Sequence, residues 1–62
     1  MKRFVTELAN HALKPYEAEP ERHEATWSRI AAAVRYCEKG MITEIEAARE
    51  IIRAVDIEEG RL

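Results

Sequence analysis

The fold is decided between Trp27 and Val55, where the sequence reads WSRIAAAVRYCEKGMITEIEAAREIIRAV. This stretch holds two apolar stripes on either side of a short break at Gly40. The first stripe consists of Trp27, Ile30, Val34, Cys37 and Met41. Because residues three and four apart lie on one face of a helix, the spacing predicts one helix before the break and another after it.

The break carries signals for the end of one helix and the start of the next. Gly40 can adopt the left-handed conformation that ends many helices, and we expect Met41 to fold back onto Tyr36. Thr43 and Glu46 have the spacing of a capping box, in which each side chain accepts from the other residue's backbone amide. Helices joined by so short a connection run antiparallel. The sequence therefore predicts a C-terminal antiparallel helical hairpin.

The second helix of the hairpin has a wide apolar face. The row that we expect to contact the first helix comprises Ile45, Ala48, Ile52 and Val55. A second row, with Ala47, Ile51 and Ala54, is expected to lie to its side. Since one helix cannot cover both rows, a further packing partner is needed, either an N-terminal helix or a second copy of the chain.

The remainder of the chain predicts one more helix. Residues 3–14 place apolar side chains on one side, and Lys14-Pro15 ends that helix because the residue before proline avoids helical dihedrals. A short acidic connector follows, and Pro20 suits the first turn of the next helix. We therefore predict an all-α fold of three helices, over residues 3–14, 20–39 and 44–57, with residues 58–62 frayed.

The length and composition of the chain indicate a thin core. Its 62 residues make a single small helical domain, 1–62, with 47% apolar and 35% charged residues. Ten of the apolar residues are alanines, which bury little area, and a single cysteine excludes an internal disulfide. Short chains commonly compensate by burying surface against another chain. We therefore expect a homodimer in which the hairpins form a helical bundle.

The charge pattern argues against nucleic acids and membranes. The net charge is −2, and the helix after the turn opens with Glu44 and Glu46, whereas a DNA recognition helix presents basic and amide side chains. A dimeric nucleic-acid-binding transcriptional regulator is the alternative reading. No apolar run reaches the length that spans a bilayer, and no secretory leader is visible, so we expect a cytoplasmic protein with no membrane partner.

The residues that could carry chemistry are few. His11 and His23 are the only histidines and Cys37 the only cysteine, and they fall short of the three or four converging ligands of a transition-metal site. Cys37 lies on the apolar stripe with no activating base nearby in the sequence. We therefore predict no enzymatic activity, no cofactor and no metal.

These observations favour a small non-enzymatic α-helical protein-protein interaction module. Stand-alone chains of this size are often regulators or inhibitors of a host enzyme, including phage and mobile-element proteins. We expect the partner-binding residues near the open end of the hairpin, where aromatic and arginine side chains gather as they do in interface hot spots. They are Tyr16, Arg22, His23, Trp27 and Arg29. The competing account is that Trp27 closes the core.

Overall fold

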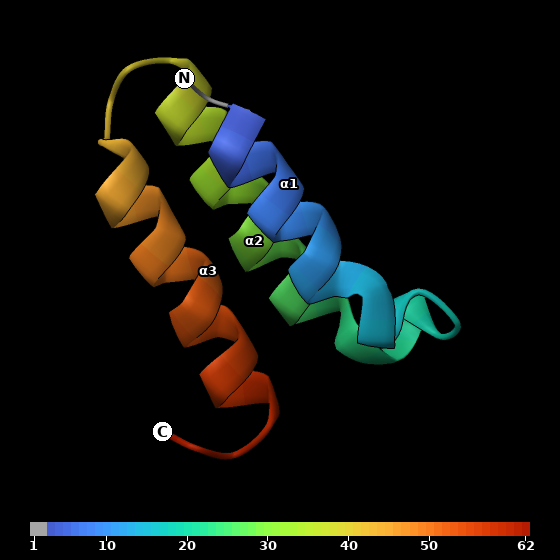
Figure 1. The fold of residues 1–62 in the computed structure, drawn as a ribbon. Coiled ribbons are helices and arrows are strands. Elements are labelled where there is room, and N and C mark those ends of the chain that lie inside the picture. The colour runs from blue at the N-terminus through green and yellow to red at the C-terminus, as the bar shows by residue number, and fades with distance from the viewer. Residues whose placement is uncertain (1–2) are drawn as a thin grey trace.

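Three α-helices make up the fold in the computed structural model, which describes residues 3–62. They are α1 (Arg3–Leu13), α2 (Glu24–Glu38) and α3 (Glu44–Glu58). The helices α1 and α3 run in the same direction, and α2 runs in the opposite direction (Figure 1). The three-helix, all-α prediction is confirmed, and no strand occurs within residues 3–62.

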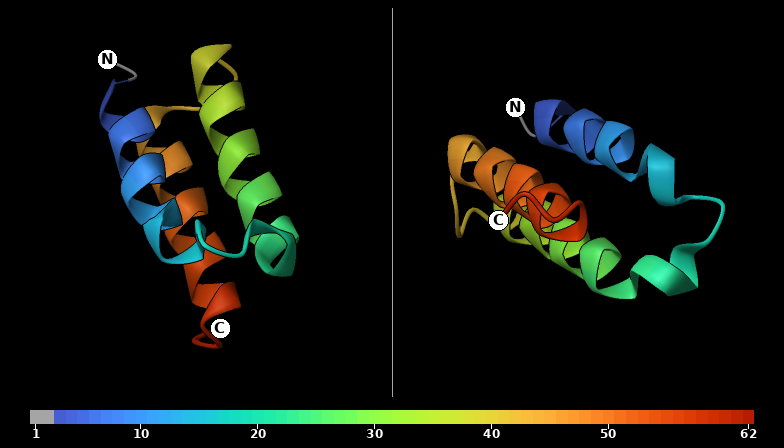
Figure 2. Two further views of the ribbon diagram at one scale, coloured as in Figure 1. Left: turned by 90° about the vertical axis from the view of Figure 1, so that its right-hand side faces the viewer. Right: turned by 90° about the horizontal axis from the view of Figure 1, so that it is seen from below.

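The connector between α1 and α2 is more structured than the sequence suggested. It forms two short 3₁₀ turns, Lys14–Tyr16 and Pro20–His23, and loops around one end of the bundle, where α3 reaches past it (Figure 2). The predicted helix start at Pro20 is therefore a 3₁₀ turn, in which the Arg22 amide donates to the Glu19 carbonyl three residues back. Proline suits the first position of either helix type, so it could not distinguish them.

The turn between α2 and α3 forms as predicted. Gly40 has φ +77°, its amide donates to the Cys37 carbonyl and the Met41 amide donates to the Tyr36 carbonyl, which is a Schellman motif. The Thr43 hydroxyl accepts from the Glu46 amide at 3.1 Å, and the Glu46 carboxylate accepts from the Thr43 amide at 2.8 Å. The side chain of Met41, however, stays exposed rather than joining the apolar stripe of α2.

The core lies where all three helices meet, and half of it is alanine. Its buried residues are Val5, Ala9, Ile30, Ala33, Cys37, Ala47, Ile51 and Ala54. Four of these eight are alanines, so α2 and α3 can approach closely while only three large aliphatic side chains fill the centre. The thin core expected from the composition is therefore present.

The predicted inner face of α3 was wrong. Ala47, Ile51 and Ala54 are buried, whereas Ile45 and Ile52 are 68% and 54% exposed. The helix is thus rotated by roughly one residue, or about 100°, from the expected orientation. The small side chains of Ala47 and Ala54 permit the close approach to α2 that an isoleucine row would prevent.

The C-terminal tail is ordered, and the prediction that residues 58–62 fray was wrong. Gly60 has φ +76°, and its amide and that of Arg61 donate to the carbonyls of Ile57 and Asp56, which makes a second Schellman motif. The Arg61 side chain also forms an ion pair with Asp56 at 2.9 Å. The charged residues of the tail suggested fraying, but Gly60 among them forms a helix cap.

Candidate protein-interaction surfaces

Two carboxylates at the end of α3 hold the connector in place. The Tyr16 hydroxyl donates to Glu59 Oε2 at 2.5 Å, and the Thr26 hydroxyl donates to Glu58 Oε1 at 2.5 Å. His23 Nδ1 lies 3.0 Å from Glu58 Oε2, and its ring centroid lies 4.6 Å from that of Tyr16. We call Tyr16, His23, Thr26, Glu58 and Glu59 the connector cluster.

The contacts of the connector cluster shift the pKa of two of its members. The hydrogen bond to Glu59 is the main cause that raises the pKa of Tyr16 to about 12, with burial and the nearby carboxylates acting in the same direction. The hydrogen bond from Thr26, followed by the contact with His23, lowers the pKa of Glu58. The folded state therefore favours a neutral Tyr16 beside an ionised Glu58.

The connector cluster engages two of the residues that we expected to bind a partner. Tyr16 is only 4% exposed and His23 is half-buried, so their polar groups serve contacts within the chain. Tyr16 is covered at this end of the hairpin because Glu58 and Glu59 belong to an ordered helix end. A partner-binding role for these residues stays a prediction.

Trp27 occupies an intermediate position. Its side chain is half-buried, and its indole N–H is shielded from solvent without a hydrogen-bond acceptor among residues 3–62. A shallow depression between the Pro20–His23 turn and α2 is lined by Trp27, Pro20 and Glu24. Trp27 is not among the residues of the core cluster or those packed against it, and a partner-binding role for it stays a prediction.

The two arginines of the predicted site point to different surroundings. Arg22 forms an exposed ion pair with Glu19 at 3.2 Å, which is worth little to stability in water. Arg29 lies near enough to Glu58 to favour its charged form. Since positions two apart on a helix are separated by about 200°, Arg29 and Trp27 lie on opposite sides of α2. The five predicted residues thus do not form one surface.

A larger apolar surface lies between α1 and α3. A groove there is lined by Leu8 and Ala12 of α1 and by Ile52 and Val55 of α3. Phe4 stands one turn before Leu8, and Ile45 stands two turns before Ile52, so both extend the same surface. We call Phe4, Leu8, Ile45 and Ile52 the α1/α3 face.

The exposure of the α1/α3 face is high for side chains of this size. Phe4, Ile45 and Ile52 are each more than half exposed, at 56%, 68% and 54%. A single exposed apolar residue needs no explanation, but a contiguous group typically marks an interaction site. The face is thus the strongest candidate for a binding surface on the described part of the chain.

Charged residues border the α1/α3 face on both sides. On the α1 side, Glu7 forms an exposed ion pair with Arg3 at 3.1 Å. On the α3 side lie Arg49 and Arg53, which make no ion pair with any residue in the range 3–62. An apolar centre with a charged border is the usual anatomy of a protein interface.

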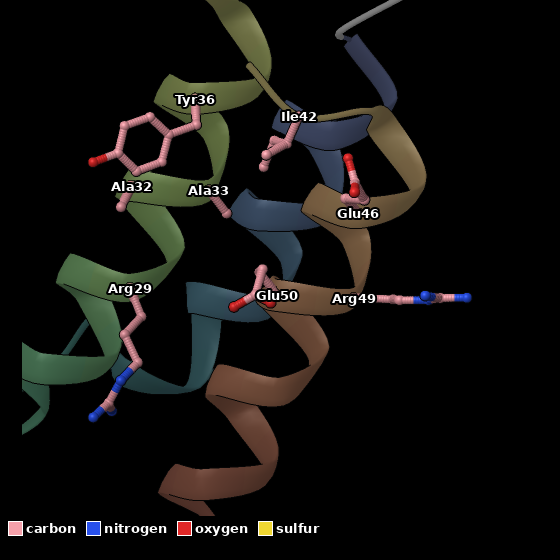
Figure 3. Close-up of a pocket in the computed structure, with 8 residues that line it drawn as sticks. All are labelled: Arg29, Ala32, Ala33, Tyr36, Ile42, Glu46, Arg49 and Glu50. Carbon is pink, nitrogen blue, oxygen red and sulfur yellow. The ribbon is translucent and has the colours of Figure 1, made fainter. Parts of the chain in front are cut away.

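A second groove, between α2 and α3, opens on the opposite side of α3 (Figure 3). It has a volume of about 560 Å³, and its floor is formed by Ala32, Ala33 and Ile42. Glu50 projects toward α2 across this groove, while Arg49 points away from it (Figure 3). Half of its lining residues are charged (Arg29, Glu46, Arg49 and Glu50), so this groove is more polar than the groove between α1 and α3.

Groups suited to catalysis or metal binding are sparse. Within residues 3–62, no three histidine, cysteine or acidic side chains gather closely enough to hold a metal ion. Cys37 is a free thiol buried in the core. Over the same residues, no helix is both long enough and apolar enough to cross a membrane.

Comparison with protein-family models, with curated proteins and with solved structures finds no match to this chain. The function of the chain is therefore inferred from the surfaces described above. The sequence pointed to Ile45 and Ile52 but assigned them to the core. The buried row of Ala47, Ile51 and Ala54, which the half-buried Glu58 continues, has an equally regular helical spacing, and this row is the signal that could have indicated the correct face.

Proposed function

We propose that this protein is a non-enzymatic α-helical interaction module that binds another protein chain through its α1/α3 face. The observation that carries the proposal is the exposure of Phe4, Ile45 and Ile52. Helical spacing places Phe4 and Ile45 on the same side as Leu8 and Ile52, which line the groove between α1 and α3. Large apolar side chains at the centre of a charged border are the residues that supply most of the binding energy in interfaces. The proposed role is therefore to cover or bridge a partner rather than to transform a substrate.

Within this class, we propose a regulator or inhibitor of a host enzyme, of the kind that phages and mobile elements encode. The support is the small size of the chain and the lack of any catalytic motif in its sequence. The homodimer and the cytoplasmic location expected from the sequence belong to the same proposal. The α1/α3 face, rather than the connector cluster, is the surface that we assign to binding.

A nucleic-acid-binding regulator is the alternative, and the geometry of the hairpin does not favour it. The helices α2 and α3 lie antiparallel (Figure 1), whereas the two helices of a helix-turn-helix cross at about 90–120°. Glu46 and Glu50 line the groove between α2 and α3, and their carboxylates would repel phosphates. Arg29 also lines this groove, whereas Arg49 points away from it (Figure 3).

The proposal is tested by affinity capture from the native host with the wild-type chain and two variants. Ile52→Asp places a charge at the centre of the α1/α3 face. Ile57→Asp is the matched control, because Ile57 is also an exposed isoleucine of α3 but projects about 140° away from Ile52. Helix content by circular dichroism establishes that both variants are folded.

The proposed function predicts that Ile52→Asp loses the captured chain, whether that is a host protein or a second copy, while Ile57→Asp keeps it. Equal capture by the wild-type chain and both variants would contradict the assignment of the face. Binding to random duplex DNA that weakens steeply with salt would support the alternative function instead.

A further inference from the structure

Resting on the proposed function, we propose that the occupant of the α1/α3 face is a second copy of this chain, with α1 of each copy packed against α3 of the other. The two-fold axis would run parallel to the helices. The face is then buried against an identical face, which is the arrangement of most soluble homodimers. This inference defines both the partner and its orientation.

The core of a single chain gives a reason for self-association. Val5, Ile30 and Ile51 are its only large aliphatic side chains, and the remaining buried members of the core are alanines and Cys37. A chain this short rarely gains much stability from one core. Pairing two α1/α3 faces would bury six further large side chains, because each copy contributes Phe4, Ile45 and Ile52.

The charges that border the face select a second copy over a uniformly acidic or basic partner. Glu7 lies at the α1 edge, one position before Leu8 and therefore about 100° around the helix. Arg49 and Arg53 lie at the α3 edge and have no acidic partner within residues 3–62. The α1 edge thus carries a carboxylate whose exposed pair with Arg3 is weak, and the α3 edge carries two arginines without an ion pair, so the two edges can complement each other.

The same charges select one of two possible two-fold axes. An axis parallel to the helices places α1 over α3 of the second copy and brings Glu7 to the arginine edge, because α1 and α3 run in the same direction (Figure 1). Glu7 and the arginine edge also lie at a similar height along the helices, since Leu8 and Ile52 line the same groove. An axis across the helices would instead set Arg49 and Arg53 against the same residues of the second copy. Like charges in an interface oppose association, which disfavours this second arrangement.

Sedimentation equilibrium of the full chain across the micromolar range, at low salt, tests the arrangement with charge reversals. We expect a wild-type dimer, and Glu7→Arg and Arg49→Glu should each weaken it by about 2- to 5-fold, the range for exposed ion pairs. The double variant should recover wild-type affinity, because the pair is restored with its signs exchanged. High salt should reduce all these differences.

The inference would be overturned by a monomer at every concentration, by single reversals with no effect, or by a double variant weaker than either single one. A dimer that Arg49→Glu strengthens would indicate the axis across the helices and would likewise overturn it. A monomer whose capture of a host protein depends on Ile52 would leave the proposed function standing. Helix content of each variant separates loss of association from loss of folding.

Discussion

The hydroxyl of Thr26 on α2 donates a hydrogen bond to the carboxylate of Glu58 on α3, across 32 residues of sequence. Glu58 stands seven residues after Ile51 and therefore on nearly the same side of α3. The bond thus helps to determine which side of α3 faces α2. It also determines which side stays outside, and Ile45 and Ile52 lie there.

Thr26→Val should destabilise the fold with little change of shape, because valine matches threonine in volume but lacks the hydroxyl. Thr26 is buried, so loss of its hydrogen bond should lower the melting temperature by about 4–8 °C, the shift expected for loss of one hydrogen bond in a chain of this size. Ser28→Ala, at an exposed position of α2, is the control. Equal melting temperatures for the two variants would show that the Thr26 bond contributes nothing.

The neighbouring isoleucines of α3 should respond in opposite ways to truncation. Ile51 is fully buried, so Ile51→Ala should cost about 2–5 kcal/mol of unfolding free energy. Ile52→Ala should change the unfolding free energy of the monomer by no more than about 0.5 kcal/mol, since Ile52 is exposed. Urea denaturation at low protein concentration measures both.

If Ile51→Ala does not fold, Ile51→Val provides the milder comparison, with an expected cost of about 0.5–1.5 kcal/mol. A larger loss for Ile52→Ala than for the Ile51 variants would restore the orientation of α3 that the apolar spacing first suggested.

Local signals were sufficient to predict the helices and the turn between α2 and α3. The capping box of Thr43 and Glu46 and the left-handed Gly40 involve only residues within one or two turns, so the sequence contains the full interaction. The rotation of α3 could not be derived in this way. It depends on Thr26 and on the small core residues of α2, which meet α3 only after folding.

The binding surface was only partly predictable for the same reason. Tyr16 was predicted to bind a partner because aromatic and arginine residues occur near it in the sequence. The composition does not reveal that Glu59 and an ordered helix end cover it. The surplus of apolar rows on α3 was correctly inferred. The rotation of α3 determines which apolar row stays exposed. Ile45 and Ile52 could therefore be identified only in the folded chain.

Gly60→Ala should destabilise the end of α3 by about 1 kcal/mol. The left-handed conformation at φ +76° is costly for any residue with a Cβ, although nothing lies near enough to clash with that atom. Gly60→Asn is the control and should lose less, because asparagine tolerates this conformation. Thermal melts measure both variants, and identical values for alanine and glycine would mean that the C-terminal cap does not form in solution.

The connector cluster should make stability depend on pH at both ends of the range. Tyr16 has a folded pKa of about 12, above its ordinary value of 10.0, so its contribution is complete below pH 10 and is lost as the pH rises toward 12. Glu58 has a folded pKa below its ordinary value of 4.5, so its contribution is complete above that pH and is lost in more acidic solution.

Tyr16→Phe isolates the alkaline part of this dependence. The variant keeps the ring against His23 but has no proton to lose, so its melting temperature should fall less than that of the wild type between pH 10 and 12. Tyr36→Phe, at an exposed position, controls for the loss of a hydroxyl elsewhere. Parallel curves for wild type and Tyr16→Phe would show that the bond to Glu59 does not persist in solution.

Photo-crosslinking in the native host tests most directly whether a protein covers the α1/α3 face. A photoreactive phenylalanine derivative replaces Ile52 in one chain and Ile57 in another, so that both probes sit on α3 but point to different sides. The account predicts a covalent adduct of higher mass from position 52, either with a second copy or with a host protein, and none from position 57. Adducts from position 57 alone, or equal yields from both positions, would contradict it.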